Sequence, residues 1–105
     1  MRLFSLTGFQ RDLLYVVSGM DHASGRAIME ELEADTGQEI TRGRLYPNLD
    51  ALVTEGLIRK GQVDRRTNYY SLSEAGWEAL RDRRAWENRR LPEGQESLEG
   101  DIPPE

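Results

Sequence analysis

The side chains best suited to bind a polyanion lie in one short segment, residues 41–48. Arginine can hold guanine or a phosphate through paired N–H donors, and a tyrosine hydroxyl can donate to a phosphate. Leucines recur at Leu45, Leu49 and Leu52 with helical spacing, so the opposite side of this helix is exposed and polar. We predict that the helix enters the DNA major groove. The expected contacts are Thr41, Arg42, Gly43, Arg44, Tyr46 and Asn48.

A second basic group follows in a predicted hairpin. The two predicted strands contain the β-branched and aromatic residues that are typical of strands, and they cover Leu57–Val63 and Thr67–Leu72. The polar tip between them is Asp64-Arg65-Arg66. Such a tip can enter the minor groove or follow the phosphates. The expected contacts here are Lys60, Arg65, Arg66 and Thr67. A solvated turn is the alternative interpretation, because basic tips are common on hairpins.

Four helices must position these groups. The first is predicted from Thr7 to Met20, where Thr7 and Gln10 have capping-box spacing. The second runs over 25–36, between a Ser24 cap and Gly37, and its outer face is acidic. After a short extended segment over 38–40, Thr41 caps the third helix, which ends near Glu55. Ser73 caps the fourth helix, 74–90. The order of helix, helix, helix, hairpin and helix predicts an α+β, mostly α fold, a winged helix-turn-helix.

Pro47 lies inside the predicted third helix. A proline removes a backbone hydrogen bond and costs roughly 3 kcal/mol in a helix interior, so it could mark the end of the helix. The leucine spacing nevertheless continues through it, from Leu45 to Leu49 and Leu52. We therefore predict a bent helix that continues past Pro47.

The last predicted helix carries two tryptophans, Trp77 and Trp86. This is more apolar area than a small monomer is expected to expose, so we predict a C-terminal dimerisation helix that pairs with the first helix. The alternative is that both rings pack on the core of their own domain. The predicted subunit contacts are Phe9, Leu13, Trp77, Leu80, Arg84 and Trp86.

The formal net charge of −5 comes from the last fifteen residues. That segment, 91–105, has five acidic residues and no basic one, which leaves fourteen of each sign in the remainder. Residues 41–66 hold six basic and three acidic side chains, a local positive surface within an acidic chain. We predict one winged-helix domain over 1–90 and a disordered acidic tail over 91–105, because the tail has few apolar groups to bury.

Composition excludes several other functions. The chain has no cysteine and a single histidine, His22, so we expect no disulfide, no metal site and no cofactor. No nucleophile elbow, glycine-rich phosphate loop or other catalytic motif is present, so we do not expect an enzyme. With no long apolar run or signal peptide, we expect a cytoplasmic protein. Thirteen of the fourteen basic residues are arginine, which together with the acidity resembles halophilic proteins; a GC-rich genome is the alternative.

Two stretches resemble the family of PadR-like transcriptional regulators. One is Gly43–Leu52 with its Leu-Tyr-Pro, followed by Gly56-Leu57-Ile58; the other is Arg65–Gly76 with its Tyr-Tyr. The resemblance covers roughly residues 5–85. It implies a winged helix, homodimers joined through the first and last helices, and operator binding, usually as a repressor. It also implies a phosphate contact by Tyr46 and DNA contacts by Arg44 and the hairpin basics. Asp50 departs from the pattern, because many relatives are basic there. Because one helix and a tail follow the hairpin, the sequence resembles the short-tailed members, and we expect no larger C-terminal sensing module.

The sequence thus predicts a sequence-specific regulator that binds a near-palindromic site on double-stranded DNA as a homodimer, with one recognition helix in each of two successive major grooves. The main alternative is a winged helix that contacts another protein and has no role on DNA. A cavity between the dimer helices could bind a small-molecule effector, but no set of residues defines such a site.

Overall fold

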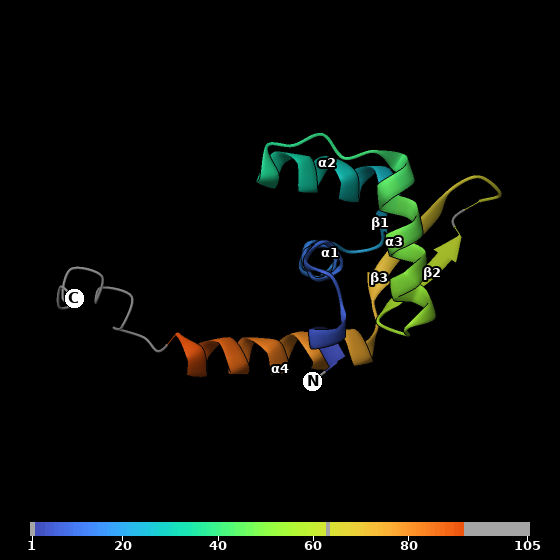
Figure 1. The fold of residues 1–105 in the computed structure, drawn as a ribbon. Helices are drawn as coiled ribbons and strands as arrows, with labels where there is room; N and C mark the ends of the chain where they lie inside the picture. The colour runs from blue at the N-terminus through green and yellow to red at the C-terminus, as the bar shows by residue number, and fades with distance from the viewer. Residues whose placement is uncertain (1, 63, 92–105) are drawn as a thin grey trace.

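The computed structural model describes residues 2–62 and 64–91, and the statements below concern those residues. Three helices precede an antiparallel hairpin, and a long helix follows it (Figure 1). The elements are η1 (Arg2–Ser5), α1 (Gly8–Ser18), β1 (Ala23–Ser24), α2 (Gly25–Thr36), α3 (Arg42–Thr54), β2 (Ile58–Gln62), β3 (Asn68–Leu72) and α4 (Glu74–Arg90). This mostly helical α+β arrangement confirms the predicted winged-helix fold class.

The helices begin where local chemistry dictates. The Thr7 hydroxyl accepts the Gln10 N–H at 3.1 Å, and the Gln10 side chain accepts the Thr7 N–H at 3.1 Å. This reciprocal capping box satisfies backbone donors that have no partner within the helix. Single hydroxyl caps begin α2, α3 and α4, as predicted; they are Ser24, Thr41 and Ser73.

Helix α3 continues through Pro47, as predicted. Leu45, Leu49 and Leu52 are completely buried on one side of it, whereas Pro47 is exposed on the other. Burial of three leucines contributes about 1.5–3 kcal/mol each, which offsets the backbone hydrogen bond that the proline removes.

The sheet has three antiparallel strands in the order β1-β3-β2. Buried Tyr70 of β3 lies opposite Ala23 on one side and Lys60 on the other. The third strand comes from Ala23–Ser24, and residues 38–40, which we predicted as a short extended segment, lie outside the sheet. The Ile40 N–H is instead donated to the Glu33 carboxylate at 2.8 Å, so a side chain replaces a strand partner.

The core surrounds α1, which packs against α2, α3, α4 and β3 (Figure 1). The buried leucines of α3 meet Leu13, Leu14 and Val17 of α1 in this core. Gly76 lets α4 approach the start of the hairpin closely, because a Cβ atom there would lie 2.3 Å from the carbonyl oxygen of Leu57, the residue before β2. The hairpin and the last helix are therefore held in one body.

No helix within the described ranges is long and apolar enough to cross a membrane. The acidic tail predicted over 91–105 lies outside the described part of the chain, except for its first residue, Leu91.

Candidate nucleic-acid interface

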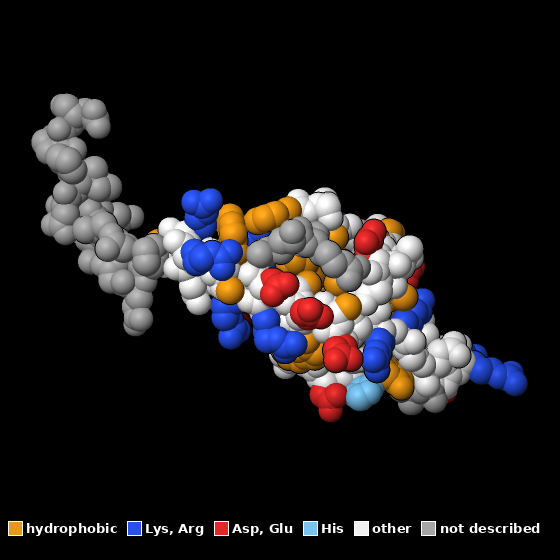
Figure 2. All heavy atoms as spheres, turned by 90° about the horizontal axis from the view of Figure 1, so that it is seen from below, with side chains coloured by type: hydrophobic (Ala, Val, Ile, Leu, Met, Phe, Trp, Pro, Cys, Tyr) orange, Lys and Arg blue, Asp and Glu red, His pale blue; other side chains and the backbone are white. Residues whose placement is uncertain are grey.

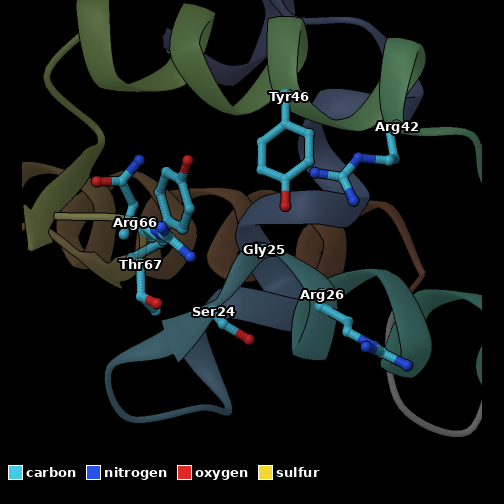
Figure 3. Close-up of a pocket in the computed structure, with 9 residues that line it drawn as sticks. Ser24, Gly25, Arg26, Arg42, Tyr46, Arg66 and Thr67 are labelled. Carbon is cyan, nitrogen blue, oxygen red and sulfur yellow. The ribbon is translucent and has the colours of Figure 1, made fainter. Parts of the chain in front are cut away.

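The amino end of α3 and the hairpin lie on the same side of the molecule. Between them and the amino end of α2 is a hollow of about 380 Å³, hereafter the cleft (Figure 3). Its lining residues are Ser24, Gly25, Arg26, Arg42, Tyr46, Arg66, Thr67, Asn68 and Tyr70. Four of the predicted DNA contacts meet here although they come from separate elements; they are Arg42, Tyr46, Arg66 and Thr67.

Tyr46 occupies the middle of this cleft. Its ring extends from α3 towards the start of α2, and its hydroxyl lies beside Gly25 (Figure 3). A Cβ atom on Gly25 would lie 2.6 Å from the Tyr46 hydroxyl oxygen, so the ring occupies space that any side chain at position 25 would fill. The Arg42 guanidinium carbon lies 5.4 Å from the Tyr46 ring centroid. A hydroxyl donor and a cation are thus held side by side.

The charge of the cleft favours an anion. Its lining includes three arginines and no acidic residue. Arg26 runs along α2 and pairs with Glu30 at 3.0 Å, where both side chains are exposed, so Arg42 and Arg66 contribute most of the positive charge. Burial raises the pKa of Tyr70 above its usual range, and the Asp50 carboxylate adds to this shift. The Tyr70 hydroxyl therefore keeps its proton.

The tip of the hairpin is ordered by Asp64. Its carboxylate accepts the Arg66 N–H at 2.8 Å and the Thr67 N–H at 2.9 Å. These two backbone hydrogen bonds lower the pKa of Asp64. The turn therefore presents Arg65 and Arg66 as exposed side chains, but only Arg66 lines the cleft.

Other predicted contacts lie outside the cleft. Thr41 caps α3, and Gly43 is exposed with open space around it. Lys60 lies on β2, and its amine forms an ion pair with the Asp50 carboxylate of α3 at 3.4 Å.

Arg44 and Asn48 occupy the other flank of α3, next to α1. The Arg44 guanidinium lies 3.9 Å above the ring centroid of Phe9. The Asn48 side chain accepts a hydrogen bond from Gln10 at 3.1 Å and donates one to the Arg44 carbonyl at 2.7 Å. The Asn48 amide is thus engaged within the chain on both its oxygen and its nitrogen.

Five residues of the cleft were not predicted from the sequence: Ser24, Gly25, Arg26, Asn68 and Tyr70. The run Ser24-Gly25-Arg26 carried a signal, since a capped helix start followed by an arginine is typical of phosphate sites. These residues were not predicted because the outer face of the same helix is acidic.

The predicted subunit contacts divide into buried and exposed groups. Leu13 is completely buried within the chain, so the prediction that it contacts a second subunit was wrong. Leu80 is 6% exposed, and Phe9 is half-buried beneath Arg44. The Trp86 ring packs edge-on against Phe4, with 5.1 Å between centroids. These packing contacts agree with the alternative that such side chains serve their own domain.

Trp77 and Arg84 remain on the surface, and the Trp77 side chain is 44% exposed. They line a hollow of about 220 Å³ between α1 and α4, hereafter the α1–α4 hollow, whose other lining residues are Tyr15, Ser18, Leu80 and Arg81. Figure 2, viewed from the α4 side, shows hydrophobic patches among arginines on this face, and basic side chains protruding at the far end of the hairpin.

Within the described residues, no three His, Cys, Asp or Glu side chains are grouped so as to hold a metal ion.

Comparison with known proteins gives the family. Residues 13–82 match the model of the transcriptional regulator PadR-like family. This chain belongs to the PadR-like family. The resemblance seen in the sequence is thereby confirmed, as is the expectation of a transcriptional regulator rather than an enzyme.

Solved structures place this PadR-like regulator among further relatives. RosR of H. salinarum is 39% identical, with a TM-score of 0.82, and the match covers 95% of this chain and 93% of that one. A complex designated RosR-S1 is 38% identical, with a TM-score of 0.82 and coverages of 97% and 93%. A PadR family transcriptional regulator from Eggerthella lenta is 27% identical, with a TM-score of 0.63 and coverages of 86% and 84%. No curated protein matches the sequence.

Proposed function

We propose that this PadR-like regulator is a sequence-specific DNA-binding repressor that binds a near-palindromic operator as a homodimer. The observation that carries the proposal is the cleft of about 380 Å³, where Arg42 and Tyr46 of α3 meet Arg66 of the hairpin around one open, positively charged space. Arginine guanidinium and tyrosine hydroxyl groups donate to phosphate oxygens, and the start of α2 adds backbone N–H donors. A DNA phosphate held here would bring the exposed side of α3, around Gly43, against the base edges.

The subunit contact that we propose lies on the α1–α4 hollow, where Trp77 and Arg84 are exposed. A second copy related by a two-fold axis would cover Trp77 and repeat the cleft on the same side of the dimer. Two recognition helices about 34 Å apart would then enter successive major grooves. The domain boundaries that we propose are 1–90 for this body and 91–105 for the acidic tail. Acting on chromosomal DNA, the protein would be cytoplasmic.

The test begins with selection of bound duplexes from a randomised pool, followed by fluorescence anisotropy on the best duplex and a scrambled one. Arg42→Ala and Arg66→Ala should each weaken binding about tenfold or more, since a hydrogen bond to a charged group contributes about 1.5–3 kcal/mol. Each should also reduce the salt dependence by about one counterion. Arg89→Ala, the same charge change at the far end of α4, is the matched control and should bind like the wild type.

The remaining parts of the proposal have separate readouts. Mass photometry of the complex should give two chains per duplex, and the selected sequence should be an inverted repeat. Placed over a promoter, that sequence should lower transcription only when the protein is present. Titrations should be run in dilute and in molar salt, because a halophilic regulator would keep its preference in both.

Winged helices can also contact proteins. If selection recovers no preferred sequence, and Arg42→Ala and Arg66→Ala bind random DNA as the wild type does, then the protein-contact module is favoured and the DNA proposal is wrong.

A further inference from the structure

Building on the proposed DNA binding, we propose that Phe9 and Gln10 are positioning residues for sequence discrimination. They lie in the first turn of α1, outside the cleft, yet both contact the flank of the recognition helix that carries Arg44 and Asn48. Through these contacts they fix the direction in which Arg44 leaves α3, and this fixed direction determines which base Arg44 can recognise.

Phe9 provides a platform for Arg44. The ring is half-buried against the hydrophobic core, and the guanidinium carbon of Arg44 lies 3.9 Å above its centroid. Stacking uses the flat face of the guanidinium and leaves the in-plane N–H donors at its edge available. Arg44 is therefore held in one orientation and can still donate two parallel hydrogen bonds, the geometry that guanine O6 and N7 accept.

Gln10 fixes the backbone beneath Arg44. Its side-chain oxygen accepts the Thr7 N–H, and its side-chain nitrogen donates to the Asn48 oxygen at 3.1 Å. The Asn48 nitrogen then donates to the Arg44 carbonyl at 2.7 Å. One continuous chain of hydrogen bonds thus joins the start of α1 to the turn of α3 that bears Arg44. Asn48 is a link in that chain, and base recognition on this flank falls to Arg44.

A prearranged arginine discriminates between bases better than a mobile one. An unrestrained Arg44 would lose rotamer freedom on binding, and it could also swing to a phosphate or a different base. The Phe9 stack removes part of this cost before DNA arrives. Loss of the stack should therefore weaken binding to the best duplex by about threefold to tenfold, and should reduce the penalty for the wrong base at the Arg44 position.

The experiment measures anisotropy of the full chain on the selected duplex and on a panel with every single base pair replaced. Phe9→Leu keeps an apolar side chain on the core but has no aromatic face. Gln10→Glu keeps the capping box, since glutamate serves there as well, but cannot donate to Asn48. Both should flatten the preference at the same base pairs as Arg44→Ala. Phe9→Tyr, which keeps the ring, is the matched control and should show the same base preferences on the panel as the wild type.

Phe9→Leu combined with Arg44→Ala should bind no more weakly than Arg44→Ala alone, because the two residues act as one unit. A full additional loss in the double variant would overturn the positioning role. So would wild-type panels for a folded Phe9→Leu and Gln10→Glu. A wild type without any sequence preference would overturn the proposed function itself, whereas a selective wild type with unaffected variants overturns only the role of Phe9 and Gln10.

Discussion

Replacement of Gly25 by alanine should weaken DNA binding without unfolding the protein. The new Cβ atom would lie 2.6 Å from both Cε1 and the hydroxyl oxygen of Tyr46. Carbon atoms rest about 3.5–4.0 Å apart, so the end of the ring must retreat by about 1 Å. Gly25 is the first residue of α2 and adopts no positive φ, so alanine suits its backbone.

The two consequences differ in size. The displaced atoms form the free end of a half-buried side chain, and alanine favours a helix by up to about 1 kcal/mol, so the free energy of unfolding should change by about 1 kcal/mol or less. The Tyr46 hydroxyl, in contrast, leaves the position beside Arg42 from which it would donate to a phosphate. A hydrogen bond to a charged group contributes about 1.5–3 kcal/mol, which corresponds to a roughly 10- to 100-fold weaker affinity.

Urea unfolding and anisotropy on the selected duplex measure both quantities. Gly8→Ala is the matched control, because the nearest atom to its Cβ would be 4.0 Å away and α1 begins there. Tyr46→Phe should reproduce the binding loss of Gly25→Ala, and the double variant should lose no more than either single one. Wild-type affinity for a folded Gly25→Ala or for Tyr46→Phe would refute the phosphate contact.

Three further predictions concern the frame that holds this surface. Gly76→Ala should destabilise the fold by about 1–3 kcal/mol in a thermal melt, because its Cβ would press to 2.3 Å from the Leu57 carbonyl and α4 must shift. Ser73→Ala should lower the free energy of unfolding in urea by about 1–2 kcal/mol, since the hydroxyl accepts the Gly76 N–H at 2.9 Å and donates to the Gly56 carbonyl at 2.7 Å. Ser71→Ala on β3 is the control. A smaller loss for Ser73→Ala than for this control would contradict the capping role. The pKa of Asp64 is lowered in the folded chain, so its stabilisation of the turn is present above the unfolded pKa and is lost as pH falls through the folded pKa. The NMR shifts of the Arg66 and Thr67 amides should report this titration with a midpoint below the usual aspartate pKa of 3.8. A higher midpoint would contradict the two backbone hydrogen bonds.

Much of the fold could be predicted from the sequence, because its signals are local. The capping side chains accept hydrogen bonds from backbone N–H groups three positions later, so four consecutive residues determine each helix start. These caps are Thr7, Ser24, Thr41 and Ser73. Gly37 ends α2 in the left-handed conformation that glycine favours. The leucine period also carried α3 correctly through Pro47. The pairing of the Leu-Tyr-Pro helix with a basic hairpin was enough to indicate the family.

The tertiary structure alone decided which of these residues meet. Ser24 and Gly25 lie beside Tyr46, which is more than twenty positions later, and Gln10 bonds to Asn48 across 38 positions. Periodicity in a sequence assigns a side chain to one face of its own helix. The partner of that face depends on how elements distant in the chain pack, since burial and hydrogen bonding are satisfied across the whole core. For this reason the sequence predicted Leu13 as a subunit contact, whereas packing buries it in the core. The hydrogen bond between Asn48 and Gln10 of α1 likewise could not be predicted from either helix alone.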